Sequence, residues 1–302
     1  MATFLTSWLA QVSGQGSVPP DWTEFENAWI VGVVYLGLVA AGLVVDAALV
    51  IRVLSRPIGW VERVRRLEGR AWTWRDAARL VLLLVACHAV GMLVYRAACP
   101  EPTPASGDAA FGIILQSMAF HWAALGFIAL ALSRKARSWK DAFGFDPRRA
   151  LRQVGLGLGL YLGALPFLWF YSVLYQAGLK YVGYEPRLQE VVWAMTAEHA
   201  WWVRAYLVGL AVALAPLVEE LVFRGIGLPL LARRIGLPAA ILAVSILFAA
   251  MHFHLPSLVP LFVIALAFAL AYVYTGSILV PAVMHAAFNL VNLGLLLLLR
   301  YA

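Results

Sequence analysis

Three charged residues lie within six positions of a strongly apolar stretch, LVEELVFRG, at residues 217–225. Each ionised side chain costs about 2.5–3.5 kcal/mol at the centre of a bilayer. In a helix, Glu220 and Arg224 stand four residues apart on one face, so their side chains can form an ion pair. Glu219 is rotated by about 100° from Glu220. The spacing therefore predicts a structural ion pair beside one carboxylate that is left for proton transfer or hydrogen bonding.

Two other apolar stretches carry polar residues at helical spacing. FAAMH places Phe248 and His252 on one helix face, and HAAFN places His285 and Asn289 one turn apart. A lone histidine in a membrane helix is usually structural, with its ring hydrogen-bonded to a nearby carbonyl oxygen. Here three apolar stretches each contribute a polar patch, which favours one shared site where Glu219 meets the other polar residues.

The composition excludes an ordinary soluble domain. Of the 302 residues, 63% are hydrophobic and 13% are charged, whereas a soluble domain is nearer half apolar and a quarter charged. A membrane-spanning helix needs about 20 apolar residues. Eight candidate runs occur, the sixth being short, at about 29–51, 80–97, 111–132, 154–175, 205–223, 238–251, 258–274 and 278–299. The sequence predicts an all-α, polytopic membrane helix bundle with about eight transmembrane helices.

The basic residues alternate along the chain with stretches that hold few of them. Eight arginines lie in residues 52–79, seven Lys or Arg in 134–152, and two at 233–234. This is the positive-inside pattern of short cytoplasmic loops, and it predicts that both termini lie outside the cytoplasm. The pattern also accounts for the net charge of +7, so we expect no nucleic acid partner. We expect a multi-pass protein of the plasma (inner) membrane if the host is bacterial.

Two regions of the chain differ in character. Residues 1–135 give three spans with few polar groups inside the membrane. Residues 136–302 begin with an amphipathic lead-in, WKDAFGFDPRRALRQ, and continue with five spans that hold nearly all of the unusual residues. We therefore expect N-terminal transmembrane helices over 1–135 and a functional core over 136–302.

The predicted span boundaries conflict with a shared site. They place Glu219 near the cytoplasmic end of the fifth span and His252 near the far end of the short sixth span. The two side chains can meet only if the sixth span starts after Pro238, or if the connection GIGLPLLARRIG dips into the membrane. Its glycines and proline permit either arrangement.

The three motifs resemble those of the CPBP family of intramembrane proteases, which includes the type II CAAX prenyl endopeptidases and the Abi proteins. The matching residues are Glu219, Glu220 and Arg224 for E-E-x-x-x-R, Phe248 and His252 for F-x-x-x-H, and His285 and Asn289 for H-x-x-x-N. Each motif alone is weakly specific, but three in the family's order inside membrane spans form a specific pattern. The first three spans carry no motif of the family.

The resemblance implies a glutamate-type intramembrane endopeptidase that hydrolyses a peptide bond of a membrane-associated protein or peptide. Glu219 with His252 would activate a water molecule, and His285 and Asn289 would donate hydrogen bonds to the developing oxyanion. The supporting residues would be Glu220, Arg224 and Phe248. This reading needs no cofactor and no metal, and its partners are the peptide substrate and the lipid bilayer.

Three alternatives fit the same residues. His252, His285 and a glutamate could bind zinc as a His₂Glu set, although no His-Glu-x-x-His stands on one helix and asparagine is a poor zinc ligand. A transporter or proton relay would also use buried Glu, His and Arg, although the chain shows no internal repeat. A non-catalytic membrane scaffold or immunity protein could retain the same fold.

Overall fold

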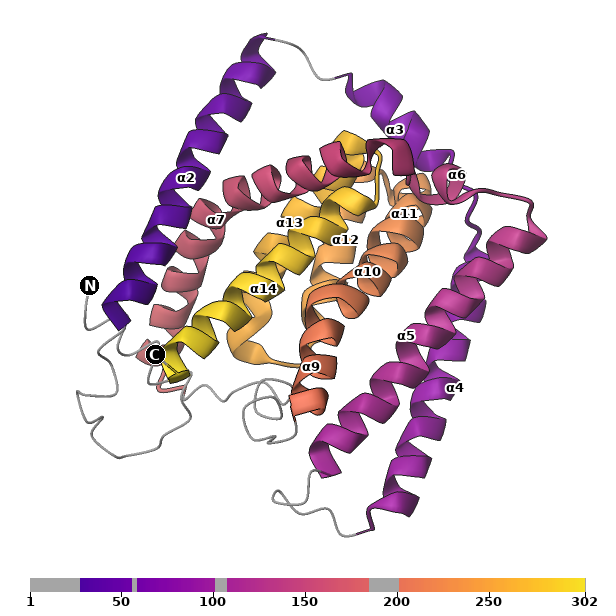
Figure 1. The fold of residues 1–302 in the computed structure, drawn as a ribbon. Helices are drawn as coiled ribbons and strands as arrows, with labels where there is room; N and C mark the ends of the chain where they lie inside the picture. Colours follow the sequence, from indigo (N-terminus) through magenta and orange to yellow (C-terminus); the bar gives the residue numbers. More distant parts are fainter. Residues whose placement is uncertain (1–27, 56–58, 101–107, 185–200, 302) are drawn as a thin grey trace.

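A computed structural model describes residues 28–55, 59–100, 108–184 and 201–301, and their regular structure is entirely helical (Figure 1). Six helices are long and apolar enough to cross a membrane, and α12 and α14 provide two further apolar segments. The main helices are α2 (Ala28–Ser55), α4 (Trp74–Ala98), α5 (Asp108–Arg134), α7 (Ala150–Tyr181), α12 (Leu237–Ala250), α13 (Leu258–Thr275), α14 (Leu279–Tyr301) and the composite helix described next. The protein is an integral, multi-pass membrane protein, as predicted.

The fifth span is longer than the sequence analysis predicts. It runs without a break from residue 201 to 235. Its parts are α9 (Trp201–Gly209), η3 (Leu210–Leu214), α10 (Ala215–Glu220), η4 (Leu221–Gly227) and α11 (Leu228–Ile235), of which η3 and η4 are π-helical. The segment GIGLPLLARRIG is thus mostly helical, and Pro229 lies just after the change from the π-helical η4 to α11.

This correction removes the conflict over the shared site. The span was expected to end at Phe223, but the helix continues to Ile235, so Glu219 lies in its middle rather than near its end. The sixth helix, α12, starts at Leu237, so neither a late start nor a dipping loop is needed. Residue spacing alone missed this because glycine and proline usually mark a helix end.

A proline and a glycine bring α2 and α7 together. Pro166 inside α7 cannot donate a hydrogen bond to the carbonyl of Leu162, and α7 changes direction along its length (Figure 1). A Cβ atom at Gly42 of α2 would lie 2.2 Å from the Leu162 carbonyl oxygen and 2.8 Å from Cδ of Pro166. Only glycine therefore permits this contact. Helix α7 also packs against α13 and α14. The division of the chain into N-terminal helices and a functional core near residue 135 remains a prediction.

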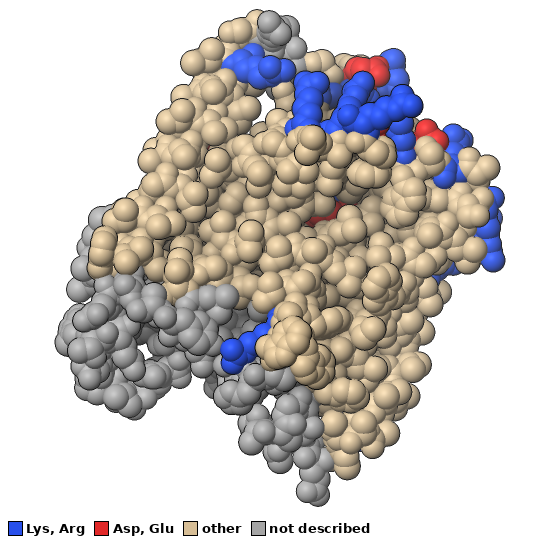
Figure 2. Space-filling view, viewed as in Figure 1, with Lys and Arg blue, Asp and Glu red and all other residues tan. Residues whose placement is uncertain are grey.

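Most of the Lys and Arg side chains visible in Figure 2 gather at one end of the bundle. Three short helices lie there, α3 (Trp60–Glu68), α6 (Trp139–Phe143) and η2 (Pro147–Arg149). Nη2 of Arg233, at the end of α11, donates a hydrogen bond of 2.7 Å to the Trp72 carbonyl oxygen. The three basic segments of the sequence thus meet at the same end, as cytoplasmic loops of one orientation must.

The lead-in segment packs directly against the fifth span. Helix α6 ends at Gly144, which adopts a φ of 73°. The preceding Phe143 is fully buried, with its ring centroid 5.3 Å from that of Trp72. A Cβ atom at Gly225 would lie 2.4 Å from the Phe143 ring. Glycine at 225 therefore lets the aromatic ring reach η4 next to Arg224.

Candidate active site

Glu220 and Arg224 form the predicted ion pair, and both side chains are fully buried. Arg224 Nη1 lies 2.8 Å from Glu220 Oε1, and Arg224 Nη2 donates a hydrogen bond of 3.0 Å to the Ala265 carbonyl oxygen of α13. The guanidinium carbon lies 4.6 Å from the ring centroid of Phe248 and 5.2 Å from that of Phe268. Together the carboxylate, the carbonyl and two aromatic faces make the buried charge tolerable.

His285 lies between the two glutamates. Its Nδ1 is 3.1 Å from Glu220 Oε1, within hydrogen-bond distance, and its Nε2 is 3.8 Å from Glu219 Oε2. The ring stacks on Phe268 with centroids 5.0 Å apart. The helical rotation between the two glutamates therefore directs them to opposite nitrogens of one imidazole. This long-range contact joins α10 to α14.

Glu219 is the glutamate of α10 that remains open to a ligand. The side chain of Glu219 is 23% exposed, whereas that of Glu220 is fully buried. Glu219 Oε2 has no hydrogen-bond partner among the described residues. Figure 2 shows acidic surface recessed in a hollow of the apolar face, where α10 and α14 lie in Figure 1. Oε2 itself is buried, so the exposed part of the Glu219 side chain lies elsewhere on it.

His252 lies in the turn after α12 and is exposed. Its Nδ1 is 2.7 Å from the Phe248 carbonyl oxygen, and the Phe248 and His252 rings are 4.8 Å apart. The Phe248 ring also contacts the ring of His285 at 5.5 Å. Phe248 thus packs between the two histidines. In the described part of the chain, no hydrogen bond or ion pair joins His252 to Glu219.

Asn289 holds α14 against the π-helical segment η3. Its Nδ2 donates a hydrogen bond of 2.7 Å to the Ala211 carbonyl oxygen. In η3 the Ala215 N–H bonds to the carbonyl of Leu210, five residues back, and the next residue, Pro216, has no N–H to offer Ala211. The Asn289 amide therefore supplies a donor that the helix backbone lacks. One amide hydrogen of Asn289 remains for another acceptor.

The described residues do not fit a zinc site. They bring no three His, Cys, Asp or Glu side chains into an arrangement that could hold a metal ion. His285 Nδ1 and Arg224 both contact Glu220 Oε1. A His₂Glu set would need His252 beside them, and no contact among the described residues joins His252 to either glutamate.

Sequence reasoning missed the contribution of α13. Phe268 stacks on His285 and faces Arg224, and the Ala265 carbonyl accepts from Arg224. No signal in the sequence separates Phe268 from other aromatic residues of the apolar runs. The Ala211 carbonyl was also missed, although a proline five residues later is a readable sign of an acceptor without a backbone donor.

Comparison with known proteins supports the resemblance stated above. Residues 199–291 match the family model described as type II CAAX prenyl endopeptidase Rce1-like. The matched segment runs from the start of α9 into α14 and contains every residue of the three motifs. Neither a curated protein nor a solved structure matches the chain.

Proposed function

We propose that the protein is an intramembrane endopeptidase that hydrolyses a peptide bond of a membrane-associated protein or peptide. The observation that carries the proposal is the cluster that Glu219, Glu220 and Arg224, at the middle of the fifth span, form with His285 of α14. Ionisable groups inside a membrane bundle are costly and usually functional. The family description, which names endopeptidases, points to the same chemistry.

Glu219 acts as the general base in this proposal. Its carboxylate accepts a proton from water while the water oxygen attacks the carbonyl carbon of the scissile bond. The same proton is then delivered to the leaving nitrogen as the C–N bond breaks, so the products are a carboxylic acid and an amine. The partial exposure of Glu219 and the unpartnered Oε2 support this role.

His285 is held by Glu220 and faces Glu219. Its Nδ1 lies within hydrogen-bond distance of Glu220 Oε1, which orients the imidazole ring. The other nitrogen, Nε2, faces Glu219 and is the proposed donor to the oxyanion that develops there. The second amide hydrogen of Asn289 is the other proposed oxyanion donor. The proposed role of His252, whose Nε2 has no partner among the described residues, is to bind the attacking water molecule.

The test is hydrolysis by the purified protein in nanodiscs. Peptides from membrane-protein termini, with and without a C-terminal prenyl group, are incubated in water enriched in ¹⁸O. We expect cleavage in which the new carboxyl terminus gains one ¹⁸O atom, detected by mass spectrometry. Solute movement across vesicles without any cleaved peptide would instead indicate the transporter reading.

Removal of metal should leave the activity unchanged. A glutamate-type mechanism uses no Lewis acid, so dialysis against a strong chelator is expected to alter the cleavage rate by less than about twofold. The measurement is the initial rate before and after dialysis, with thermal unfolding as a control for stability. Activity that disappears with chelator and returns with zinc would overturn the mechanism.

Asn289→Ala should lower the cleavage rate by roughly 10²–10³, the usual effect of removing one oxyanion donor. The same change leaves the Ala211 carbonyl without its donor, so we combine it with Pro216→Ala, which restores a backbone N–H at that place. The double variant should regain stability yet remain slow. If it recovered full activity, Asn289 would be structural only.

A further inference from the structure

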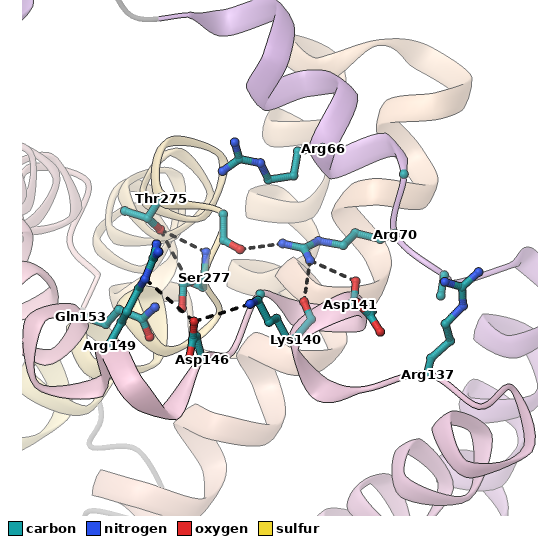
Figure 3. A pocket seen from close by; sticks show the side chains of 14 residues that line it. Arg66, Arg70, Arg137, Lys140, Asp141, Asp146, Arg149, Gln153, Thr275 and Ser277 are labelled. Carbon is teal, nitrogen blue, oxygen red and sulfur yellow. Dashed lines mark hydrogen bonds and ion pairs between the residues drawn. The ribbon is translucent and has the colours of Figure 1, made fainter.

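A second polar site lies at the basic end of the bundle, away from the glutamates. Here α3, α6, η2 and the turn between α13 and α14 enclose a cavity of about 570 Å³. This volume lies in the usual range for ligand pockets. Five cationic and two acidic side chains line the cavity, and Figure 3 shows Arg66, Arg70, Lys140 and Arg149 around one space.

The acidic side chains do not neutralise this cavity. Asp141 is engaged by Ser138 in the capping box of α6, and the hydrogen bonds from Ser138 lower the pKa of its carboxyl. Asp146 lies 3.7 Å from Lys140 Nζ and 3.8 Å from Arg149 Nε. The other lining arginines form no ion pair within the described ranges; they are Arg66, Arg70 and Arg137. The cavity therefore retains a positive charge.

Arg70 and Ser277 show that the cavity is a built site rather than a chance gathering of surface arginines. Arg70 is only 7% exposed, and its Nη atoms donate to the carbonyl oxygens of Lys140, Asp141 and Gly276 at 3.2, 3.0 and 2.5 Å. Its Nε has no partner among the described residues, and neither has Oγ of Ser277, which is 3% exposed. Two buried side chains that line one cationic cavity thus each hold a donor without an acceptor.

A partly apolar extension adjoins the cationic cavity. This neighbouring cavity of about 510 Å³ shares Arg149 and Ser277 with the first. Leu49 of α2, Leu156 of α7 and Val280 of α14 line it, together with three further arginines, Arg52, Arg63 and Arg152. Helices α2 and α7 are both long and apolar enough to cross the membrane. The combined site therefore holds arginines throughout and adds apolar side chains from membrane-crossing helices.

We propose that this site binds an anionic phospholipid, with its phosphate among Arg66, Arg70 and Arg149 and the start of an acyl chain beside Leu49, Leu156 and Val280 in the extension. Phosphate oxygens are the acceptors that arginine forks and a buried hydroxyl fit. A basic pocket between membrane helices on the positive side is the setting in which such headgroups bind. The apolar extension favours a lipid over a soluble phosphate.

The test compares two double variants with equal loss of charge. Arg66→Gln with Arg149→Gln removes two cavity cations whose side chains, unlike that of Arg70, donate to no backbone carbonyl among the described residues. The control, Arg65→Gln with Arg75→Gln, removes two exposed arginines outside both cavities. Binding of phosphatidylglycerol is titrated in phosphatidylcholine nanodiscs by native mass spectrometry. We expect roughly 20-fold weaker binding for the cavity pair and less than about threefold for the control pair.

Three outcomes would overturn the proposal. Equal losses in both pairs would mean a diffuse electrostatic attraction, and no loss in either would mean that the lipid binds elsewhere. If glycerol phosphate raised the unfolding temperature as much as short-chain phosphatidylglycerol at equal concentration, the occupant would be a soluble phosphoester.

Ser277→Ala should also weaken binding of phosphatidylglycerol. The substitution breaks no side-chain hydrogen bond, because the Ser277 hydroxyl has no partner among the described residues.

Discussion

Glu219→Gln is expected to fold like the parent protein and to lose peptide cleavage. Glutamine keeps the shape of the side chain but cannot accept a proton from water, and a general base contributes about 10²–10⁴ in rate. The fold should be preserved because Glu219 Oε2 has no hydrogen-bond partner among the described residues and the side chain is partly exposed. The rate is measured by mass spectrometry and the stability by thermal unfolding.

The control for Glu219→Gln is a carboxylate at the surface of the same protein. Glu62→Gln alters a glutamate whose side chain is 63% exposed and whose partner, Arg65, is also exposed. It should change neither the rate nor the unfolding temperature. Full cleavage by Glu219→Gln would show that the site is wrongly placed, whatever the result for metal removal.

Removal of one member of the buried ion pair is expected to produce the largest loss of stability. Glu220→Gln leaves Arg224 without its carboxylate, and Arg224→Ala leaves Glu220 without its guanidinium, in surroundings where both side chains are fully buried. Breaking a buried pair from one side typically costs about 3–5 kcal/mol. Since domains are stable by about 5–15 kcal/mol, yield and unfolding temperature should both fall.

The double variant Glu220→Gln with Arg224→Met separates pairing from burial. It removes both charges, so the loss of stability should be smaller than the sum of the single losses. The matched control is the exposed pair of Glu62 and Arg65, at 3.7 Å, where removing one partner should cost about 0–1 kcal/mol. Single variants with unchanged unfolding temperature and lost activity would assign the pair to catalysis instead.

Local spacing was enough to predict the elements and the ion pair. The apolar runs matched the helices because bilayer thickness demands long apolar segments, and Glu220 and Arg224 meet because they are four residues apart in one helix. The predicted end of the fifth span was wrong, because tertiary packing around Gly225 and Pro229 outweighed the usual tendency of glycine and proline to end a helix.

The position of His285 between the two glutamates could not be read from spacing. It depends on how α14 crosses α10, and that crossing is set by the packing of Phe248 and Phe268 on either side of the imidazole ring. Motif resemblance indicated that the residues share a site, but it contains no distances. Whether His252 acts with Glu219, as the resemblance implies, remains a prediction.

The hydrogen bond from Asn289 to Ala211 makes the order of substitutions matter in the history of the chain. A lineage that lost Asn289 first would leave the Ala211 carbonyl bare beside Pro216, at a cost in stability. A lineage that first replaced Pro216 would regain a backbone donor, after which Asn289 could change without that cost. With respect to stability, position 289 is therefore freer to vary in descendants whose residue at 216 is no longer proline, while the proposed catalytic role still favours asparagine.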